Sequence, residues 1–138
     1  MSAYVFDANA ILDYVFNGIN APTVRDILKQ TGKKDVNLLI SSAQVGEVYY
    51  EVARRKGADL AKETLKRLED LGFQFSDFTP ERATAAADLR LECHLAFADS
   101  AAAGLAIEQN AVVVTADKDF EKVEKRVKIK WLKGSHHD

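Results

Sequence analysis

Five acidic residues stand at positions from which their carboxylates could act together: Asp7, Glu47, Asp99, Asp117 and Asp119. Carboxylates that lie close together repel one another, so a cluster is costly unless a proton or a cation neutralises it. Carboxylate oxygens suit Mg²⁺ or Mn²⁺, which keep several waters of their own. One or two such ions could activate a water and stabilise an in-line displacement at phosphorus, without a covalent nucleophile from the protein.

Each of these acids also has an ordinary structural explanation. Asp7 and Asp99 stand where helices are expected to begin, and Asp is a favoured N-cap residue. Glu47 lies opposite an apolar helical stripe, where a side chain faces solvent by default. Asp119 is sufficiently explained as an acid in a turn or a first helical turn. The hypothesis of a metal site therefore depends on the whole set.

The hydrophobic pattern alternates strand-like and helix-like segments. Strands are expected near residues 3–6, 37–41, 73–78, 111–115 and 127–132. Helices are expected near residues 8–16, 21–30, 43–56, 58–71, 80–93, 99–109 and 120–125. This alternation predicts a three-layer α/β/α sandwich around a central parallel sheet of about four to five strands.

The composition fits one folded domain. Of 138 residues, 47% are hydrophobic and 29% are charged, which excludes disorder for the bulk of the chain. We expect a single domain over residues 1–133 and a disordered tail over residues 134–138. In an open parallel sheet, ligands bind beyond the carboxyl ends of the strands. The five acids follow strands or begin the next helix, so they could converge at that edge.

The acids lie inside short motifs that resemble those of the PIN domain family. The motifs are Asp7-Ala-Asn9, Ser42-x-x-x-x-Glu47, Phe97-Ala-Asp99-Ser-Ala-Ala-Ala-Gly-Leu-Ala106 and Val114-Thr115-Ala-Asp117-Lys-Asp119-Phe120. They occur in the family's order and at its usual spacing, and the resemblance covers nearly the whole chain. One departure is Ser100, where many members carry Ala; it should not disturb the neighbouring acid.

This resemblance implies a Mg²⁺- or Mn²⁺-dependent endoribonuclease that hydrolyses RNA phosphodiester bonds. The implied catalytic and metal-binding quartet is Asp7, Glu47, Asp99 and Asp117. Three further residues would support it: Asn9 and Thr115 as groups that orient carboxylates or bound water, and Asp119 as an auxiliary acid.

Within that family, the chain is most similar to the VapC-type toxins of bacterial and archaeal toxin–antitoxin pairs. The likeness implies an RNA substrate, a protein antitoxin that occupies the cleft, and a homodimer. Apolar surface on the expected helical hairpin of residues 43–71, including Tyr49 and Tyr50, could serve either protein contact. Tyr49 is favoured as a core residue.

The net charge of −2, from 19 basic and 21 acidic residues, weighs against binding of nucleic acid. The distribution matters more than the total. Lys and Arg outnumber acids seven to four between residues 117 and 134, and Arg54-Arg55-Lys56 forms a second basic cluster. We assign contacts with the RNA backbone to Arg54, Arg55 and Lys118, with a solvated surface as the alternative explanation.

Other classes of protein are less consistent with the sequence. Cys93 is the single cysteine, so no intrachain disulfide can form, and a cytoplasmic location is expected. No apolar run approaches the roughly 20 residues that span a bilayer, so no membrane association is expected. Cys93 with His94 does not make a zinc site, and Trp131 and Gly104 are expected to serve packing.

Two alternatives compete with the nuclease. A phosphatase of the haloacid dehalogenase type also begins with an Asp after the first strand, but it needs a second Asp where Asn9 stands. A non-catalytic PIN-like interaction domain could use the acidic pocket only to bind a cation. The complete quartet disfavours the second alternative, and loss of RNA cleavage on Asp7→Asn would separate it from the nuclease.

Overall fold

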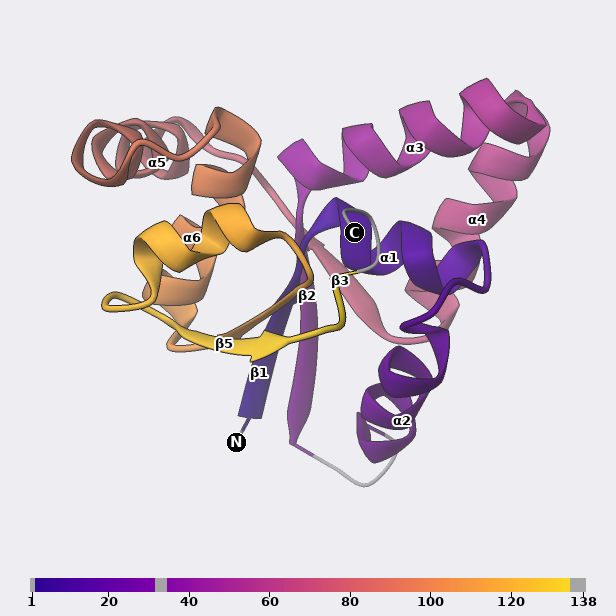
Figure 1. Ribbon diagram of the computed structural model, residues 1–138. Coiled ribbons are helices and arrows are strands. Elements are labelled where there is room, and N and C mark those ends of the chain that lie inside the picture. The colour runs from indigo at the N-terminus through magenta and orange to yellow at the C-terminus, as the bar shows by residue number, and fades with distance from the viewer. Residues whose placement is uncertain (1, 32–34, 135–138) are drawn as a thin grey trace.

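Five parallel strands form the central sheet of this computed structural model, which describes residues 2–31 and 35–134 (Figure 1). The strands are β1 (Ser2–Phe6), β2 (Val36–Ser41), β3 (Phe73–Ser76), β4 (Val112–Thr115) and β5 (Lys128–Trp131). Their order is β3-β2-β1-β4-β5, and each neighbouring pair is parallel. The expected parallel sheet is therefore confirmed.

Helices connect the strands in the expected alternation. They are α1 (Ala8–Val15), α2 (Ala21–Thr31), α3 (Ser42–Lys56), α4 (Ala58–Asp70), α5 (Pro80–Cys93), α6 (Phe97–Gln109) and the 3₁₀ helix η1 (Lys118–Val123). In Figure 1, α1 to α4 lie on one side of the sheet and α6 lies on the other, with α5 beside it.

Two helix starts differ from the sequence expectation. Helix α6 begins two residues before Asp99 rather than at it. The cap of α3 is Ser41, whose Oγ accepts a hydrogen bond from the N–H of Ala43 over 3.3 Å. Ser42, which would cap a helix that began at the expected residue 43, accepts instead from the N–H of Phe78 over 2.9 Å. Its hydroxyl therefore holds the segment after β3, a long-range contact that no local pattern reveals.

The two faces of the sheet bury separate apolar clusters. Phe6 and Leu38 belong to the cluster beneath α1 to α4, whereas Val5, Leu39 and Val113 belong to the cluster beneath α6 and η1. Consecutive strand residues point to opposite faces, so two continuous apolar faces require two covering layers. The expected three-layer α/β/α sandwich is confirmed.

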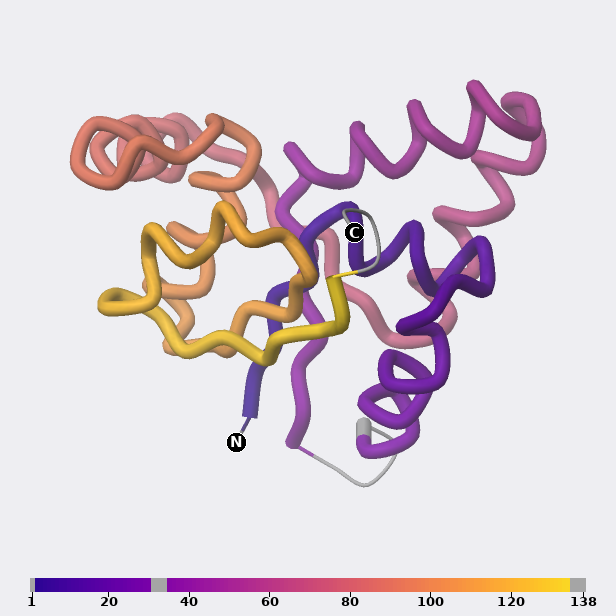
Figure 2. Tube along the Cα trace, viewed as in Figure 1, coloured from indigo at the N-terminus to yellow at the C-terminus, as the bar shows by residue number. Residues whose placement is uncertain are grey.

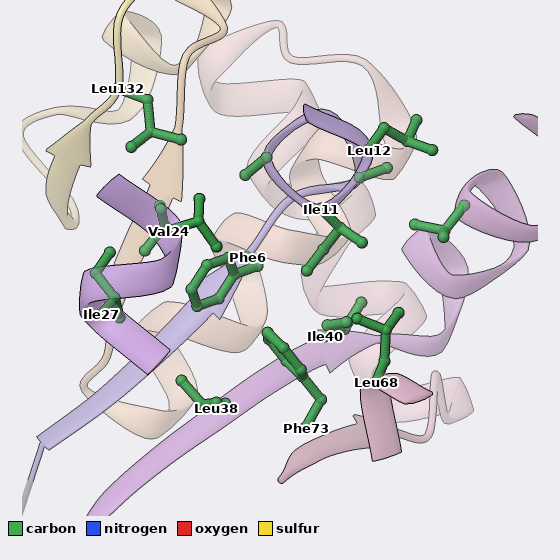
Figure 3. Close-up of a cluster of buried hydrophobic side chains, with 14 of the residues drawn as sticks. Phe6, Ile11, Leu12, Val24, Ile27, Leu38, Ile40, Leu68, Phe73 and Leu132 are labelled. Carbon is green, nitrogen blue, oxygen red and sulfur yellow. The ribbon is translucent and has the colours of Figure 1, made fainter. Parts of the chain in front are cut away.

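Aromatic packing anchors the larger cluster across the sheet. The rings of Phe6 and Phe73 meet edge to face, with centroids 5.1 Å apart and planes at 84° (Figure 3). Burying a side chain of this kind contributes about 1.5–3 kcal/mol. The cluster fixes the position of β1, and with it the residue that follows the strand.

Several expectations about individual residues can be compared with the structure. Tyr49 is partly buried and packs against the larger cluster, whereas Tyr50 is 61% exposed. Cys93 is half-buried against the smaller cluster. Trp131 is 37% exposed and lies in neither cluster, contrary to the packing expected for it. A Cβ placed on Gly104 would meet no atom of the described residues within 4 Å, so the prediction of close packing there is wrong.

None of the helices in the described ranges combines the length and apolar character needed to cross a membrane. The tail expected at residues 134–138, with His136 and His137, lies outside the described residues apart from Gly134.

Candidate metal centre

The carboxyl ends of β1 and β4 bring the acidic residues to one edge of the sheet. Asp7 directly follows β1 and caps α1, and Asp117 follows β4 and caps η1. Asp99 lies in the first turn of α6, and Asp119 lies in the first turn of η1. Since β1 and β4 are neighbours, residues far apart in sequence meet here, as the rule for open parallel sheets predicts.

Three carboxylates form a group that could hold a metal ion. One oxygen from each of Asp99, Asp117 and Asp119 lies within 4.8 Å of the other two. Asp7 and Glu47 are close enough for their charges to matter: Asp99 and Asp117 raise the pKa of Asp7, and Glu47 raises that of Asp99. A donor set made only of carboxylate oxygens fits a hard cation such as Mg²⁺ or Mn²⁺.

Asp7 is the most buried acid of the site. It is 1% exposed; one oxygen accepts from the N–H of Ala10 over 2.8 Å, and the other accepts from the hydroxyl of Thr115 over 2.5 Å. Burial, followed by the charges of Asp99 and Asp117, raises its pKa to about 7, although both hydrogen bonds act to lower it. Asp7 therefore caps a helix and faces the acidic group at once, so the two interpretations of this residue are compatible.

Asp99 is half-buried, and no helix-capping role accounts for it. The N-cap of α6 is Ala96, and no side chain in the described part of the chain caps that helix, so the capping interpretation is wrong for Asp99. Burial, followed by the charges of Asp117, Glu47 and Asp119, raises its pKa to about 6. The deprotonated form of Asp99 is therefore disfavoured, and a bound cation would offset this cost.

Glu47 lies on α3 at the rim of the site. The residue is exposed, as expected for a side chain opposite the apolar stripe. Its charge nevertheless contributes to the raised pKa of Asp99. Partial burial of its own carboxyl group, followed by the charge of Glu51, raises its pKa. Glu47 is therefore near the acidic group but does not belong to the group of three carboxylates.

Gln44 is a residue of the site that the sequence interpretation missed. It is 1% exposed; its Oε1 accepts from the N–H of Ala8 and its Nε2 donates to the carbonyl of Ala98, both over 2.8 Å. It also lowers the pKa of Asp99 by hydrogen bonding. One amide thus joins α1, α3 and α6. A signal existed, since Gln44 stands four residues before the buried Val48, on the apolar face of its helix.

Among the other predicted residues, Thr115 is buried at the end of β4, and its hydroxyl also accepts from the N–H of Asp117 over 2.9 Å. Asn9 is exposed, and its side chain makes no hydrogen bond to any described residue. Ser100 is buried beside Asp99, and its hydroxyl has no partner within the described ranges.

The predicted basic residues are divided between two places. Lys118 is exposed between Asp117 and Asp119, next to the acidic group. Arg54 pairs with Glu51 over 2.5 Å at the surface. Arg55 lies with its guanidinium 4.6 Å from the ring centroid of Phe16, near the end of α3. The structure therefore brings Lys118 to the acids and places the two arginines two helical turns beyond Glu47.

The sequence profile of the PIN domain family matches residues 4–126, so the chain belongs to the PIN domain family. Among curated proteins, none matches it in sequence.

Solved structures with the same fold include VapC-type toxins. The VapBC2 structure from Rickettsia felis, bound to a promoter DNA fragment, superposes with a TM-score of 0.74 at 19% identity, covering 94% of this chain and 98% of that chain. FitAcB from Neisseria gonorrhoeae gives 0.65 at 23% identity, covering 91% and 95%. VapC20 from Mycobacterium tuberculosis, described as a toxin that cleaves the sarcin-ricin loop, gives 0.66 at 12% identity, covering 90% and 95%.

Proposed function

We propose that this protein is a metal-dependent endoribonuclease that hydrolyses RNA phosphodiester bonds, and that it acts as the toxin of a toxin–antitoxin pair. The observation that carries the proposal is the grouping of Asp99, Asp117 and Asp119 beside the buried Asp7. Family membership and the fold shared with VapC-type toxins support it.

Asp7, Glu47, Asp99 and Asp117 are the proposed catalytic and metal-binding residues, with Asp119 as an auxiliary acid. These carboxylates would hold Mg²⁺ or Mn²⁺, which would supply Lewis-acid chemistry: activation of water and neutralisation of charge on the scissile phosphate.

The protein's own part in the reaction is to hold these acids in place and to bind the RNA backbone. Thr115 fixes one oxygen of Asp7, and Gln44 fixes the starts of α1 and α6 against α3. Asn9 is exposed, and its amide has no hydrogen-bond partner among residues 2–31 and 35–134, which suits orientation of water or substrate. Arg54, Arg55 and Lys118 supply positive charge for RNA phosphates, so binding weakens as salt rises.

Partners and location follow from the same proposal. Solved structures with the same fold include one described as a toxin–antitoxin complex and one described as a member of a family of toxin–antitoxin systems, which supports a protein antitoxin for this chain as well. Exposed apolar side chains suited to protein contacts are Tyr50, on α3, and Leu91 and Phe97, near α5 and α6. We assign these surfaces to the antitoxin and to a homodimer, and we place the protein in the cytoplasm.

The decisive experiment compares cleavage of structured and single-stranded RNAs by the wild type and by Asp99→Asn, with Mg²⁺, Mn²⁺ or EDTA. Asp70→Asn is the matched control, because Asp70 is an exposed acid beside the start of β3, at the opposite edge of the sheet. We expect metal-dependent cleavage by the wild type and by Asp70→Asn but not by Asp99→Asn. Equal cleavage by all three proteins would refute the site, and cation binding without any cleavage would favour the interaction domain.

A further inference from the structure

A cavity of about 340 Å³ lies on the α1 side of the sheet. Asn9 and Ala116 form part of its wall. Asn9 lies two residues after Asp7, at most about 7 Å along an extended chain, and Ala116 directly precedes Asp117. A molecule in this cavity would therefore lie next to whatever occupies the acidic group.

The cavity combines an apolar part with a polar rim. Leu12, Phe16 and Leu132 provide the apolar part, and Asn9, Asp13 and Arg55 provide the polar groups.

Arg55 is the most distinctive of these groups. Its guanidinium lies 4.6 Å from the ring centroid of Phe16, and its side chain is 46% exposed. Its ion pair with Glu51 is long, at 3.5 Å between Nε and the carboxylate. A guanidinium laid on an aromatic ring presents its other flat face, and its N–H groups at the edge, to a ligand.

The walls of the cavity are held in place before any ligand binds. Asn20 is buried; its N–H donates to Oδ2 of Asp13 over 2.7 Å, and its side-chain amide bonds both the N–H and the carbonyl of Lys133, each over 2.8 Å. These hydrogen bonds tie the segment after β5, next to Leu132, to the connection between α1 and α2. Figure 2 shows the course of the chain through both segments. A preformed cavity costs little ordering when a ligand enters.

We propose that this cavity is a subsite for one unpaired nucleobase beside the scissile phosphate, with Arg55 stacking on the base and Asn9 contacting its edge. The inference rests on the proposed ribonuclease function and adds a determinant of sequence preference. Unpaired RNA bases are recognised by stacking on aromatic rings or arginine planes and by hydrogen bonds to their edges. A phosphate gains nothing from the apolar part, and the carboxylate of Asp13 repels it, so the cavity suits a base better than a phosphate.

The test is a titration of ¹⁵N-labelled protein in EDTA with single-stranded RNA tetranucleotides that differ at one position. The wild type should show shifts at the side-chain amide of Asn9 and at Nε–H of Arg55, and affinity should depend on the base. Arg55→Lys keeps the charge but loses the plane, so the preferred tetranucleotide should bind between about fivefold and 150-fold more weakly, with discrimination lost. Arg67→Lys, the matched control, should leave both affinity and base preference unchanged, because Arg67 is an exposed arginine of α4 that does not line the cavity.

Two results would overturn the inference: shifts confined to the acidic group and Lys118, or equal effects of Arg67→Lys and Arg55→Lys on base preference. Because EDTA removes the cation, the outcome does not depend on catalysis. Cleavage of the same tetranucleotides with Mn²⁺ tests the proposed function separately. Base-dependent shifts with no cleavage of the tetranucleotides or of the structured RNAs would support the subsite and refute the nuclease. Cleavage with no shift at the side-chain amide of Asn9 would support the nuclease and refute the subsite.

Discussion

The hydroxyl of Thr115 donates a hydrogen bond of 2.5 Å to Oδ2 of Asp7, across the junction of β4 and β1. Both residues are buried, and the pairing of Phe6 with Val114 places them side by side. The same hydroxyl accepts from the N–H of Asp117. One side chain therefore positions two of the proposed metal ligands, and it opposes the rise that burial causes in the pKa of Asp7.

Removing this hydroxyl should weaken the site without removing an acid. We expect Thr115→Val to lower Mn²⁺ affinity and RNA cleavage by about 10- to 100-fold, the usual effect of losing a group that orients a metal ligand. The pKa of Asp7 should also rise, because a hydrogen bond that favours the carboxylate is lost. Calorimetric titration with Mn²⁺ and a cleavage assay measure the first two effects. Thr115→Ser keeps the hydroxyl and should stay close to wild type; equal losses in both variants would contradict the role.

The raised pKa values predict how stability depends on pH in the absence of metal. Burial raises the pKa of Asp7 to about 7 and that of Asp99 to about 6, from 3.8 for each. At pH values between 3.8 and these raised pKa values, the native state binds more protons than the unfolded chain, so the free energy of unfolding falls as pH rises. The stability that the protonated Asp7 and Asp99 contribute is fully present below the unfolded pKa, and it is lost as pH rises through the folded pKa. At 1.36 kcal/mol per pKa unit, Asp7 accounts for at most about 4 kcal/mol of the pH-dependent change in the free energy of unfolding.

Denaturant unfolding in EDTA at pH 5 and pH 8 measures this dependence. The wild type should be less stable at pH 8, and Asp7→Asn should reduce the difference, because asparagine stays neutral at both pH values. Asparagine can still accept from Ala10, so the variant should fold. With saturating Mn²⁺ the trend should reverse, since the cation binds the deprotonated acids. A wild type that is equally stable at both pH values in EDTA would contradict the assigned pKa shifts.

The sequence predicted the elements and the acidic edge because both depend on local patterns. Period-2 and period-3.6 hydrophobicity locate strands and helices, and the parallel-sheet rule then places Asp7 and Asp117 at one edge. The start of α6 was misplaced because no polar cap marks it; its N-cap is Ala96. Gln44 was missed because its partners, Ala8 and Ala98, lie 36 and 54 residues away. Periodicity shows that a position is buried, but it does not identify the backbone groups that the buried side chain satisfies.

Gln44 should matter for stability as well as for the site. Gln44→Met keeps the size of the side chain but leaves the N–H of Ala8 and the carbonyl of Ala98 without the partner they have now. Each unsatisfied buried group costs about 1–3 kcal/mol, so the free energy of unfolding should fall by about 2–6 kcal/mol in denaturant unfolding. Gln74→Met is the control, because Gln74 is exposed on β3, and it should change little. Equal effects of the two variants would show that the amide of Gln44 is not structurally required.

Two glycines should respond to alanine in opposite directions. At Gly18, a Cβ would lie 1.9 Å from Oδ1 of Asp13, whose other oxygen is held by the N–H of Asn20. Gly18→Ala must displace that carboxylate, so we expect the free energy of unfolding to fall by about 1–3 kcal/mol, as for other overpacked positions. The displacement should also loosen the wall of the cavity that Asp13 and Asn20 share.

Gly104 is the counterpart, because it lies inside α6 with a negative φ and open space where a Cβ would stand. Glycine costs a helix interior about 0.8–1.0 kcal/mol relative to alanine, so Gly104→Ala should raise the free energy of unfolding by about that amount. Gly104 faces α5 and Arg126 rather than the acids, and cleavage should stay unchanged. Denaturant unfolding of both glycine variants checks the pair. A destabilising effect of Gly104→Ala would contradict this prediction. It would mean that another molecule fills the space beside α6 where the Cβ would stand.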